Sequence, residues 1–160
     1  MLFRSSIGAA IFRKRSDGAN WLHMEKAPSE QAMGSCSDQI LRVFAARDLL
    51  VSLRDDRELL EKSFTLTGEH ELAHVLEAKN GGWTVRRATL KQTRGFQYTG
   101  NVDQLVTRIL ARCDGQAPLG RLATALADEM NVAPDQLIPS CLKVVRVLLE
   151  TGFLIPSSHR

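Results

Sequence analysis

The most regular pattern of apolar and polar residues lies between residues 101 and 156. Apolar residues recur there every three or four positions, which is the spacing of an amphipathic helix. Three such stripes follow one another, at residues 102–110, 119–130 and 137–149, and a short apolar segment at 153–156 comes after them. The pattern therefore predicts three helices and a final strand, an arrangement similar to a winged helix.

Capping and turn residues mark the expected ends of these helices. Asn101 is a suitable N-cap for the first helix, and Gly152 is a suitable C-cap for the third. Residues 113–116, Cys-Asp-Gly-Gln, have the composition of a turn. Pro118 and Pro134 suit the openings of the second and third helices, where the missing N–H would have no partner in any case.

The preceding part of the chain has mixed periodicity. Residues 7–12 are uniformly apolar over the length of a strand, and residues 28–37 read as a polar linker. A helix is expected over residues 38–53, with Ser35 or Ser37 as its cap. Asn80, Gly81 and Gly82 then indicate a hairpin turn between two strands, the second of which alternates over residues 83–92.

These elements predict an α+β fold in three regions. Residues 1–37 would hold a strand remnant and a linker, residues 38–95 a helix and a β-hairpin, and residues 96–160 the winged-helix-like C-terminal unit. The length of 160 residues, with 44% hydrophobic and 24% charged residues, is typical of a globular chain.

Composition also restricts location and partners. No apolar run approaches the roughly 18 residues of a membrane span, so we expect no membrane association and a cytoplasmic location. Three cysteines lie far apart without the spacing of metal ligands, and they read as free thiols. Residues 101–160 carry six basic and six acidic side chains, and this neutral balance argues against a nucleic-acid partner.

One short motif suggests metal chemistry. His70, Glu71 and His74 fit H-E-x-x-H, in which two histidines on one face of a helix chelate zinc and the glutamate activates a zinc-bound water. That interpretation makes His70 and His74 metal ligands and Glu71 the catalytic base of a metallopeptidase. It requires a helix, because on a strand the two imidazoles would stand about 13 Å apart.

The sequence around the motif favours a strand. Gly68 precedes it, the hairpin turn at residues 80–82 follows it, and no third ligand continues the pattern downstream. Solvated histidines on a strand are therefore the simpler interpretation, and zinc hydrolysis remains an alternative.

Several segments together resemble a known family. They are residues 7–15, 20–21, 39–44, 81–83, 95–103, 110–119 and 145–154. This set is similar to the C-terminal region of bacterial class I S-adenosylmethionine-dependent methyltransferases. The resemblance implies that residues 7–12 are the last sheet strand of a methyltransferase domain.

The cofactor-binding half of such an enzyme is missing from this sequence. Class I methyltransferases hold their cofactor at a glycine-rich loop, and no G-x-G occurs in the 160 residues. The resemblance therefore implies a non-catalytic accessory region that binds no S-adenosylmethionine itself. Its partner would be a methyltransferase catalytic domain, in cis or in trans, and its role would be to recognise a substrate or partner. No catalytic or cofactor-binding residue is carried over.

A second resemblance implies a different class of function. The segment 110–154 is similar in outline to small peptide-chaperone domains of peptide-modifying pathways, such as the carrier of pyrroloquinoline quinone biosynthesis. These domains bind a leader peptide along a sheet edge beside a helix. Here the strand at residues 83–92 would offer that edge.

Overall fold

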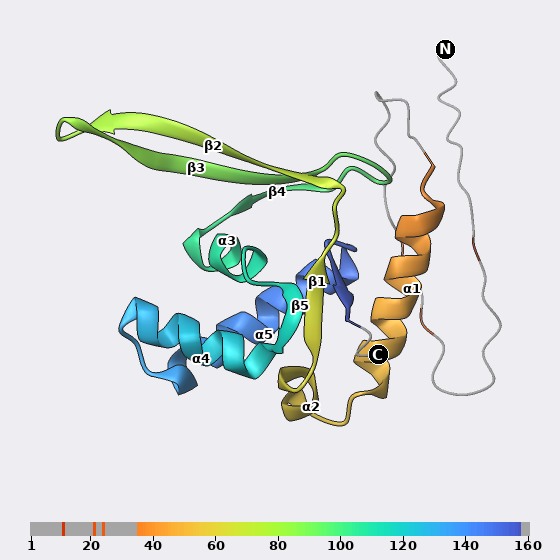
Figure 1. Ribbon diagram of the computed structural model, residues 1–160. Helices are drawn as coiled ribbons and strands as arrows, with labels where there is room; N and C mark the ends of the chain where they lie inside the picture. Colours follow the sequence, from red (N-terminus) through yellow and green to blue (C-terminus); the bar gives the residue numbers. More distant parts are fainter. Residues whose placement is uncertain (1–10, 12–20, 22–23, 25–34, 158–160) are drawn as a thin grey trace, which may run out of the picture.

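The computed structural model describes Ile11, Trp21, Met24 and residues 35–157 (Figure 1). The described residues form helices and antiparallel sheets, which confirms the predicted α+β fold. The elements are α1 Ser37–Ser52, α2 Asp56–Leu60, β1 Ser63–Leu66, β2 His70–Lys79, β3 Gly82–Gln92, β4 Thr99–Val102, α3 Gln104–Leu110, β5 Asp114–Pro118, α4 Leu119–Met130, α5 Pro134–Glu150 and β6 Leu154–Pro156.

Two three-stranded sheets organise these elements. The first has the order β5-β1-β6, and β1 pairs antiparallel with both neighbours. In this sheet Phe64 lies opposite Pro156, and Thr65 lies between Asp114 and Ile155. The second sheet has the order β2-β3-β4. The first sheet therefore joins strands from both sides of the boundary that we expected at residue 95.

The three predicted C-terminal helices are present as α3, α4 and α5. Helix α5 is central, since α1, α2, α3 and α4 all contact it. It ends where Gly152 adopts a φ of +75° while the Gly152 and Phe153 N–H groups donate to Leu149 and Leu148. This is a Schellman ending, which the position of the glycine indicated.

Two local expectations for this unit were wrong. The first helix starts at Gln104 with Asp103 as its cap, because Asn101 lies in β4, where it pairs with Thr89. Residues 114–118 form β5 instead of a turn. Gly115 there has a φ of +87°, so the turn-forming residue is accommodated inside a strand that β1 pairs.

The N-terminal part agrees with prediction in one element. Helix α1 lies within one residue of the expected range, but its N-cap is Cys36 and neither serine caps it with its side chain. The Phe44 ring of α1 lies 5.2 Å from the Trp21 ring, centroid to centroid. The strand expected at residues 7–12 lies outside the described residues except for Ile11, which is exposed.

One hydrophobic core holds the described elements together. It contains buried residues from every helix and from the three strands β1, β3 and β6, between Ala46 of α1 and Leu154 of β6. Leu59, Phe64, Leu126 and Leu149 are among its fully buried side chains. Within the described residues, no helix combines the length and the apolar character that crossing a membrane requires.

The hairpin of β2 and β3 projects from this body as a long arm (Figure 1). Its turn is the predicted one, with φ values of +51° at Asn80 and +76° at Gly81. Both positive values are the signature of a type I′ turn, which matches the twist of paired strands. The ladder contains one bulge between Val75 and Leu76, so that Arg86 is the extra residue of β3.

Candidate functional site

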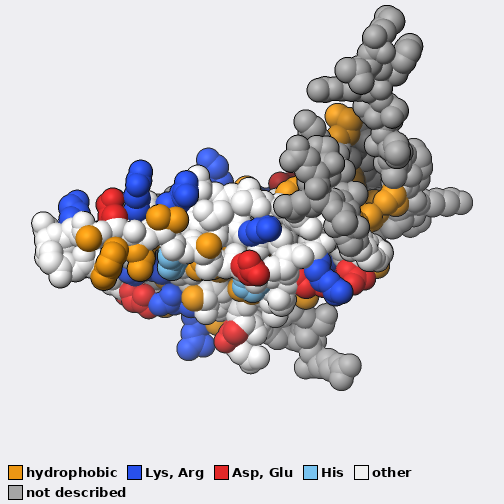
Figure 2. Space-filling model, turned by 90° about the horizontal axis from the view of Figure 1, so that it is seen from above, with side chains coloured by type: hydrophobic (Ala, Val, Ile, Leu, Met, Phe, Trp, Pro, Cys, Tyr) orange, Lys and Arg blue, Asp and Glu red, His pale blue; other side chains and the backbone are white. Residues whose placement is uncertain are grey.

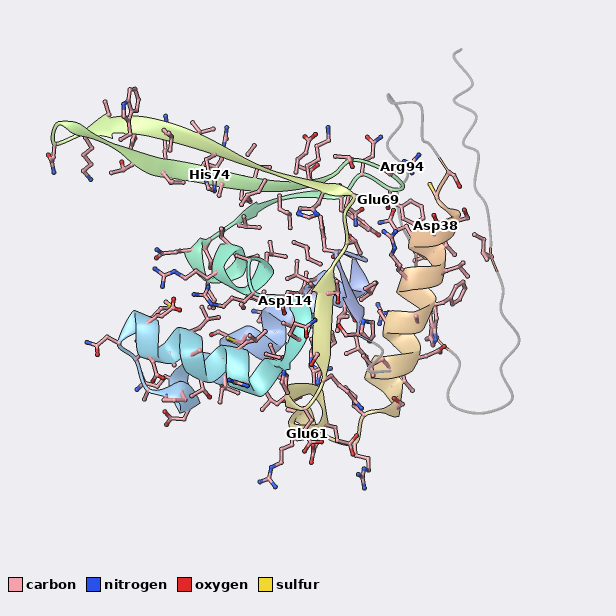
Figure 3. All side chains as sticks on the ribbon, in the orientation of Figure 1. Asp38, Glu61, Glu69, His74, Arg94 and Asp114 are labelled. Carbon is pink, nitrogen blue, oxygen red and sulfur yellow. The ribbon has the colours of Figure 1, made fainter. Side chains whose placement is uncertain are left out.

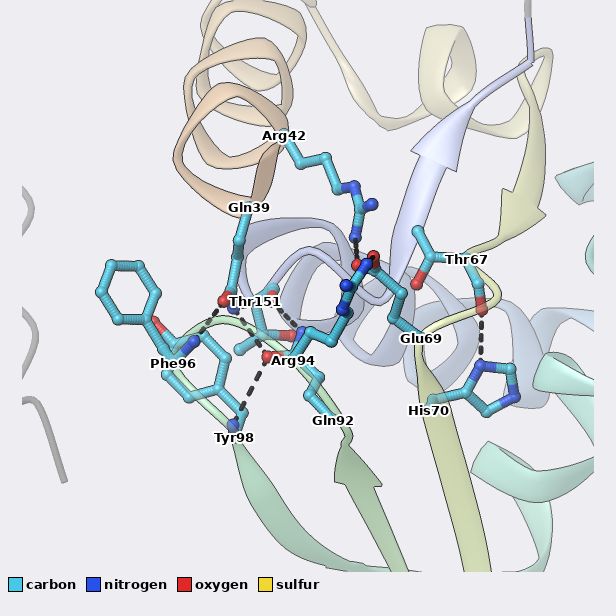
Figure 4. A network of polar contacts seen from close by, with 10 residues as sticks. All are labelled: Gln39, Arg42, Thr67, Glu69, His70, Gln92, Arg94, Phe96, Tyr98 and Thr151. Atoms are coloured by element: carbon cyan, nitrogen blue, oxygen red, sulfur yellow. Dashed lines mark hydrogen bonds and ion pairs between the residues drawn. The ribbon is translucent and has the colours of Figure 1, made fainter. Parts of the chain in front are cut away.

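The H-E-x-x-H motif lies on a strand, as its context predicted. Residues 70–79 form β2, in which neighbouring side chains point to opposite faces. His70 and His74 therefore share one face at a separation of about 13 Å, while Glu71 lies on the other face. The His70 Nδ1–H donates to the carbonyl oxygen of Thr67 (Figure 4). The helix that zinc chelation requires is not formed.

The surroundings of the motif supply no further ligands. No group of three or more His, Cys, Asp or Glu side chains in the described part of the chain is arranged to hold a metal ion. Figure 3 shows His74 part-way along the projecting arm, distant from the carboxylates labelled on the body. This geometry gives no support to the metallopeptidase alternative.

A buried polar network lies where the arm joins the body (Figure 4). The Gln39 Nε2 donates to Gln92 Oε1 at 2.7 Å, and the Gln92 Nε2 donates to the Thr151 carbonyl oxygen, also at 2.7 Å. The backbone N–H of Phe96 donates to Gln39 Oε1, and that of Tyr98 donates to Gln92 Oε1. The two amide side chains thus have partners on both their donor and their acceptor atoms, which indicates a structural role.

Beside this network, Glu69 binds two arginines. Its Oε2 lies 2.9 Å from Arg42 Nη1, and its Oε1 lies 3.5 Å from Arg94 Nη1. The hydrogen bond from Arg42 is the main reason why the pKa of Glu69 lies below its usual value. Figure 3 shows Glu69 and Arg94 at the base of the arm, next to the start of α1.

A small cavity of about 70 Å³ lies between these groups. Its lining includes Gln39, Arg42, Glu69, Gln92 and Arg94. That volume holds a few water molecules and is well below the roughly 300 Å³ at which pockets for small organic ligands begin. The cavity belongs to the structural joint between α1 and the arm.

Two of the three thiols are buried. Burial raises the pKa of Cys113 to about 12, and the carboxylate of Asp114 adds to this effect. Burial also raises the pKa of Cys141. Because the thiolate is the nucleophile, neither cysteine is activated for covalent catalysis. All three cysteines are free, in agreement with their interpretation as free thiols.

The most distinctive surface of the molecule is one face of the projecting arm. The ladder places Leu72 opposite Leu90, Leu76 opposite Val85, and Ala78 opposite Trp83. Cross-strand partners point to the same side, so these residues form one stripe. Near the body the stripe is buried at Leu90, whereas its outer part is exposed, up to 72% at Trp83. We call the residues Leu72, Leu76, Trp83 and Val85 the apolar face of the arm.

The bulge keeps this face continuous. Val85 and Ala88 are three positions apart, and in a regular strand they would point to opposite sides. With Arg86 as the extra residue, Val85 pairs with Leu76 and Ala88 pairs with His74, so both stay on the same side. The buried side of the sheet therefore continues beyond the body as an exposed apolar stripe.

The other face of the arm is charged. On β2 this face carries Glu71, Val75, Glu77 and Lys79, which alternate along the strand with the residues of the apolar face. On β3, Arg87 lies opposite Val75 and Lys91 lies opposite Glu71. Figure 2, which looks down on the arm, shows Lys and Arg side chains along it with hydrophobic side chains between them. The arm thus presents an apolar side and a polar side to its surroundings.

The strand edges of the arm are largely free in the described chain. Strand β2 pairs only with β3, and β3 pairs with β4 only at residues 88–91. The edge that we expected to be available over residues 83–92 is therefore open only up to residue 87, because β4 occupies the rest. The outer edge of β2 is open along residues 70–79.

A comparison with known families places the chain. The family model of a domain of unknown function, DUF7782, matches residues 41–156, from α1 to the end of β6. The chain belongs to the DUF7782 family. No curated protein matches it. The DUF7782 match includes the arm, all three C-terminal helices, and Gln92 and Thr151 of the polar network, whereas Gln39 lies two residues before it.

Two features of the DUF7782 chain escaped the sequence reasoning. Gln39 takes the buried helical position before Val43 and Ala46, and Gln92 takes the buried strand position after Ala88 and Leu90. The sequence signal for this pair was a glutamine at a position where the period of the helix or strand calls for an apolar residue. The apolar face of the arm was hidden because an alternating strand normally covers a core.

Proposed function

We propose that this chain is a non-catalytic binding module that recognises a substrate or partner protein through the apolar face of its projecting arm. The observation that carries the proposal is the exposure of Leu72, Leu76, Val85 and Trp83, which range from 39% to 72% exposed on one face. Large apolar side chains gathered on one surface mark sites of interaction, since single ones scattered over the surface need no such explanation.

The shape of the arm supports the same role. A hairpin that projects from a body loses the burial that sheets normally gain, and two strands alone are only marginally stable. A partner that covers the apolar face would supply the missing burial. Trp83 is suited to anchor such a contact because its large ring buries much area at little conformational cost.

We further propose that the module is the C-terminal accessory region of an S-adenosylmethionine-dependent methyltransferase in the cytoplasm. This part rests on the resemblance of residues 95–103, 110–119 and 145–154 to that family. The catalytic domain, in cis or in trans, would bind the cofactor. The polar groups of this chain support a non-catalytic role, because the buried amides and Glu69 have partners inside the protein.

Isothermal titration tests the proposal that the catalytic domain, and not this chain, binds the cofactor. The chain should release no binding heat with S-adenosylmethionine, and tight binding by the chain alone would overturn the accessory role. A second experiment retrieves partners with the tagged chain from its source cells. We expect a protein that becomes covalently labelled when ultraviolet light is applied in the presence of radiolabelled S-adenosylmethionine. Such labelling is the property of a methyltransferase catalytic domain.

Matched variants show whether the arm makes this contact. The double substitution Leu76→Ser and Trp83→Ser should abolish retrieval of the labelled protein. The control is Val51→Ser with Val147→Ser, which removes exposed apolar side chains from α1 and α5. Equal retrieval by both double variants would contradict recognition through the arm.

A second candidate function is favoured by the free edge of β3. An extended leader peptide would add a strand beside residues 82–87, with main-chain hydrogen bonds for affinity. In that case the retrieved ligand would be a short peptide, and the Leu76→Ser and Trp83→Ser variant would retain much of its binding. Edge pairing depends mainly on the backbone, so this outcome separates the two functions.

A further inference from the structure

The outer edge of β2 has the features of a pairing surface. It is ten residues long, contains neither proline nor glycine, and is exposed from Glu71 to Lys79. Proteins usually protect such an edge with proline, a bulge, short length or a cover, because its free N–H and C=O groups bind other strands. Here the bulge residue lies on β3, and the described residues provide no cover for β2.

We propose that two copies of the chain associate through this edge, with their β2 strands antiparallel and Val75 opposite the Val75 of the second copy. In a two-fold symmetric pair, each side chain must point to the same side as the one opposite it. A centre at Val75 meets this condition, since it places residue 73 opposite 77 and residue 72 opposite 78.

The charges of β2 select this register. With Val75 at the centre, Glu71 of one copy lies opposite Lys79 of the other, and the symmetry repeats the pair. Shifting the centre to His74 would place Glu71 opposite Glu77, which is unfavourable. Shifting it to Leu76 would place Lys79 opposite Ala73 and form no charge pair. Charge complementarity therefore favours a second copy of this strand as the occupant of the edge.

The pairing would join two three-stranded sheets into one of six strands. Because the two-fold axis is perpendicular to the sheet, the apolar faces of both arms would lie side by side on the same surface. The Glu71 and Lys79 pairs would lie on the opposite surface. The dimer goes beyond the proposed function, since it uses the strand edge and leaves the apolar face open.

Sedimentation equilibrium of the full chain tests the association. The wild type should be in monomer–dimer equilibrium, and Lys79→Glu should weaken the dimer about tenfold or more, because it creates two like-charge pairs. Arg87→Glu is the matched control, with the same change in net charge on the strand away from the edge. It should leave the equilibrium within about twofold of the wild type. Circular dichroism confirms that both variants fold.

A charge swap tests the register by rescue. Glu71→Lys combined with Lys79→Glu restores opposite charges between copies. Glu71 also lies opposite Lys91 in its own hairpin, so the rescue variant carries Lys91→Glu as well. This triple variant should recover the dimer that Lys79→Glu loses. Failure to recover in a folded triple variant would overturn the register.

Cysteine cross-linking gives an independent readout. In a Cys36→Ser background, Val75→Cys places two thiols directly opposite each other across the axis, whereas Ala73→Cys places them about 13 Å apart. Mild oxidation should link the first variant into a covalent dimer and leave the second without an intermolecular disulfide. A chain that stays monomeric throughout would overturn the proposal and leave the edge for an extended peptide of another protein.

Discussion

Gln39 of α1 donates a 2.7 Å hydrogen bond to Gln92 of β3, across 53 residues of sequence. Both side chains are buried, and both also donate to the carbonyl oxygen of Thr151 at the end of α5. The pair thus fixes the base of the arm to two helices of the body. The direction of the arm therefore depends on these buried amide groups.

Gln39→Ala should lower the free energy of unfolding by about 2–3 kcal/mol. The substitution leaves the Phe96 N–H without its side-chain partner and the Gln92 carbonyl oxygen with only the longer bond from the Tyr98 N–H, and an unpaired buried group costs about 1–3 kcal/mol. Urea denaturation measures the change. Gln136→Ala, at an exposed position of α5, is the control and should change the value by less than about 0.5 kcal/mol. A change that small for Gln39→Ala would contradict a structural role of the pair.

Gly95→Ala should also destabilise the junction between α1 and the arm, in this case through a steric clash. Gly95 has a φ of +71°, and a Cβ at this position would lie 2.0 Å from Gln39 Oε1. We expect a loss of about 2 kcal/mol or more, from the left-handed backbone and the displaced amide together. Gly100→Ala in β4 should be neutral or slightly stabilising, because no atom lies within 4 Å of its added Cβ. Thermal unfolding of both variants distinguishes a local clash from a general effect of alanine.

Much of the fold could be predicted from local sequence. The stripes of α4 and α5, the range of α1 and the Asn80 turn all depend on periodicity or on backbone preferences of single residues. These signals act within a few positions of the chain. They therefore appear in the sequence without knowledge of tertiary contacts.

The expectations that were wrong depended on distant partners. Residues 113–116 have turn chemistry, yet residues 114–118 become β5 because β1, about 50 residues earlier, pairs with them. Asn101 and Asp103 both suit an N-cap, and the pairing of β4 with β3 decides between them. The paired amides and the projecting apolar face likewise depend on which elements meet in space.

Leu90 and Leu76, two of the leucines of the arm, should respond very differently to truncation. Leu90→Ala removes a side chain that is 2% exposed and should lower the unfolding free energy by about 2–5 kcal/mol. Leu76→Ala removes the same side chain at 49% exposure, and it should cost less than about 1 kcal/mol. Guanidinium titration of both variants measures the difference. Similar losses for both would mean that the apolar face is covered by the chain itself.

The ion pairs of Glu69 make stability depend on pH in a definite direction. Arg42 first, through its hydrogen bond, and then Arg94 lower the pKa of Glu69 below its ordinary value of 4.5. The folded state therefore stabilises the ionised form of Glu69 more than the unfolded state does. The stabilisation is present above about pH 4.5 and is lost as the pH falls through the lower, folded-state pKa.

Glu69→Gln tests this effect. Below about pH 4.5 the unfolding free energy of the wild type should fall more steeply than that of the variant, and the two curves should converge at the acid end. Glu61→Gln removes an exposed carboxylate from the end of α2 and controls for net charge. Added salt should reduce the difference between wild type and Glu69→Gln, because the three side chains are partly exposed. Parallel curves for the wild type and Glu69→Gln at low salt would show that the arginines do not hold the carboxylate in solution.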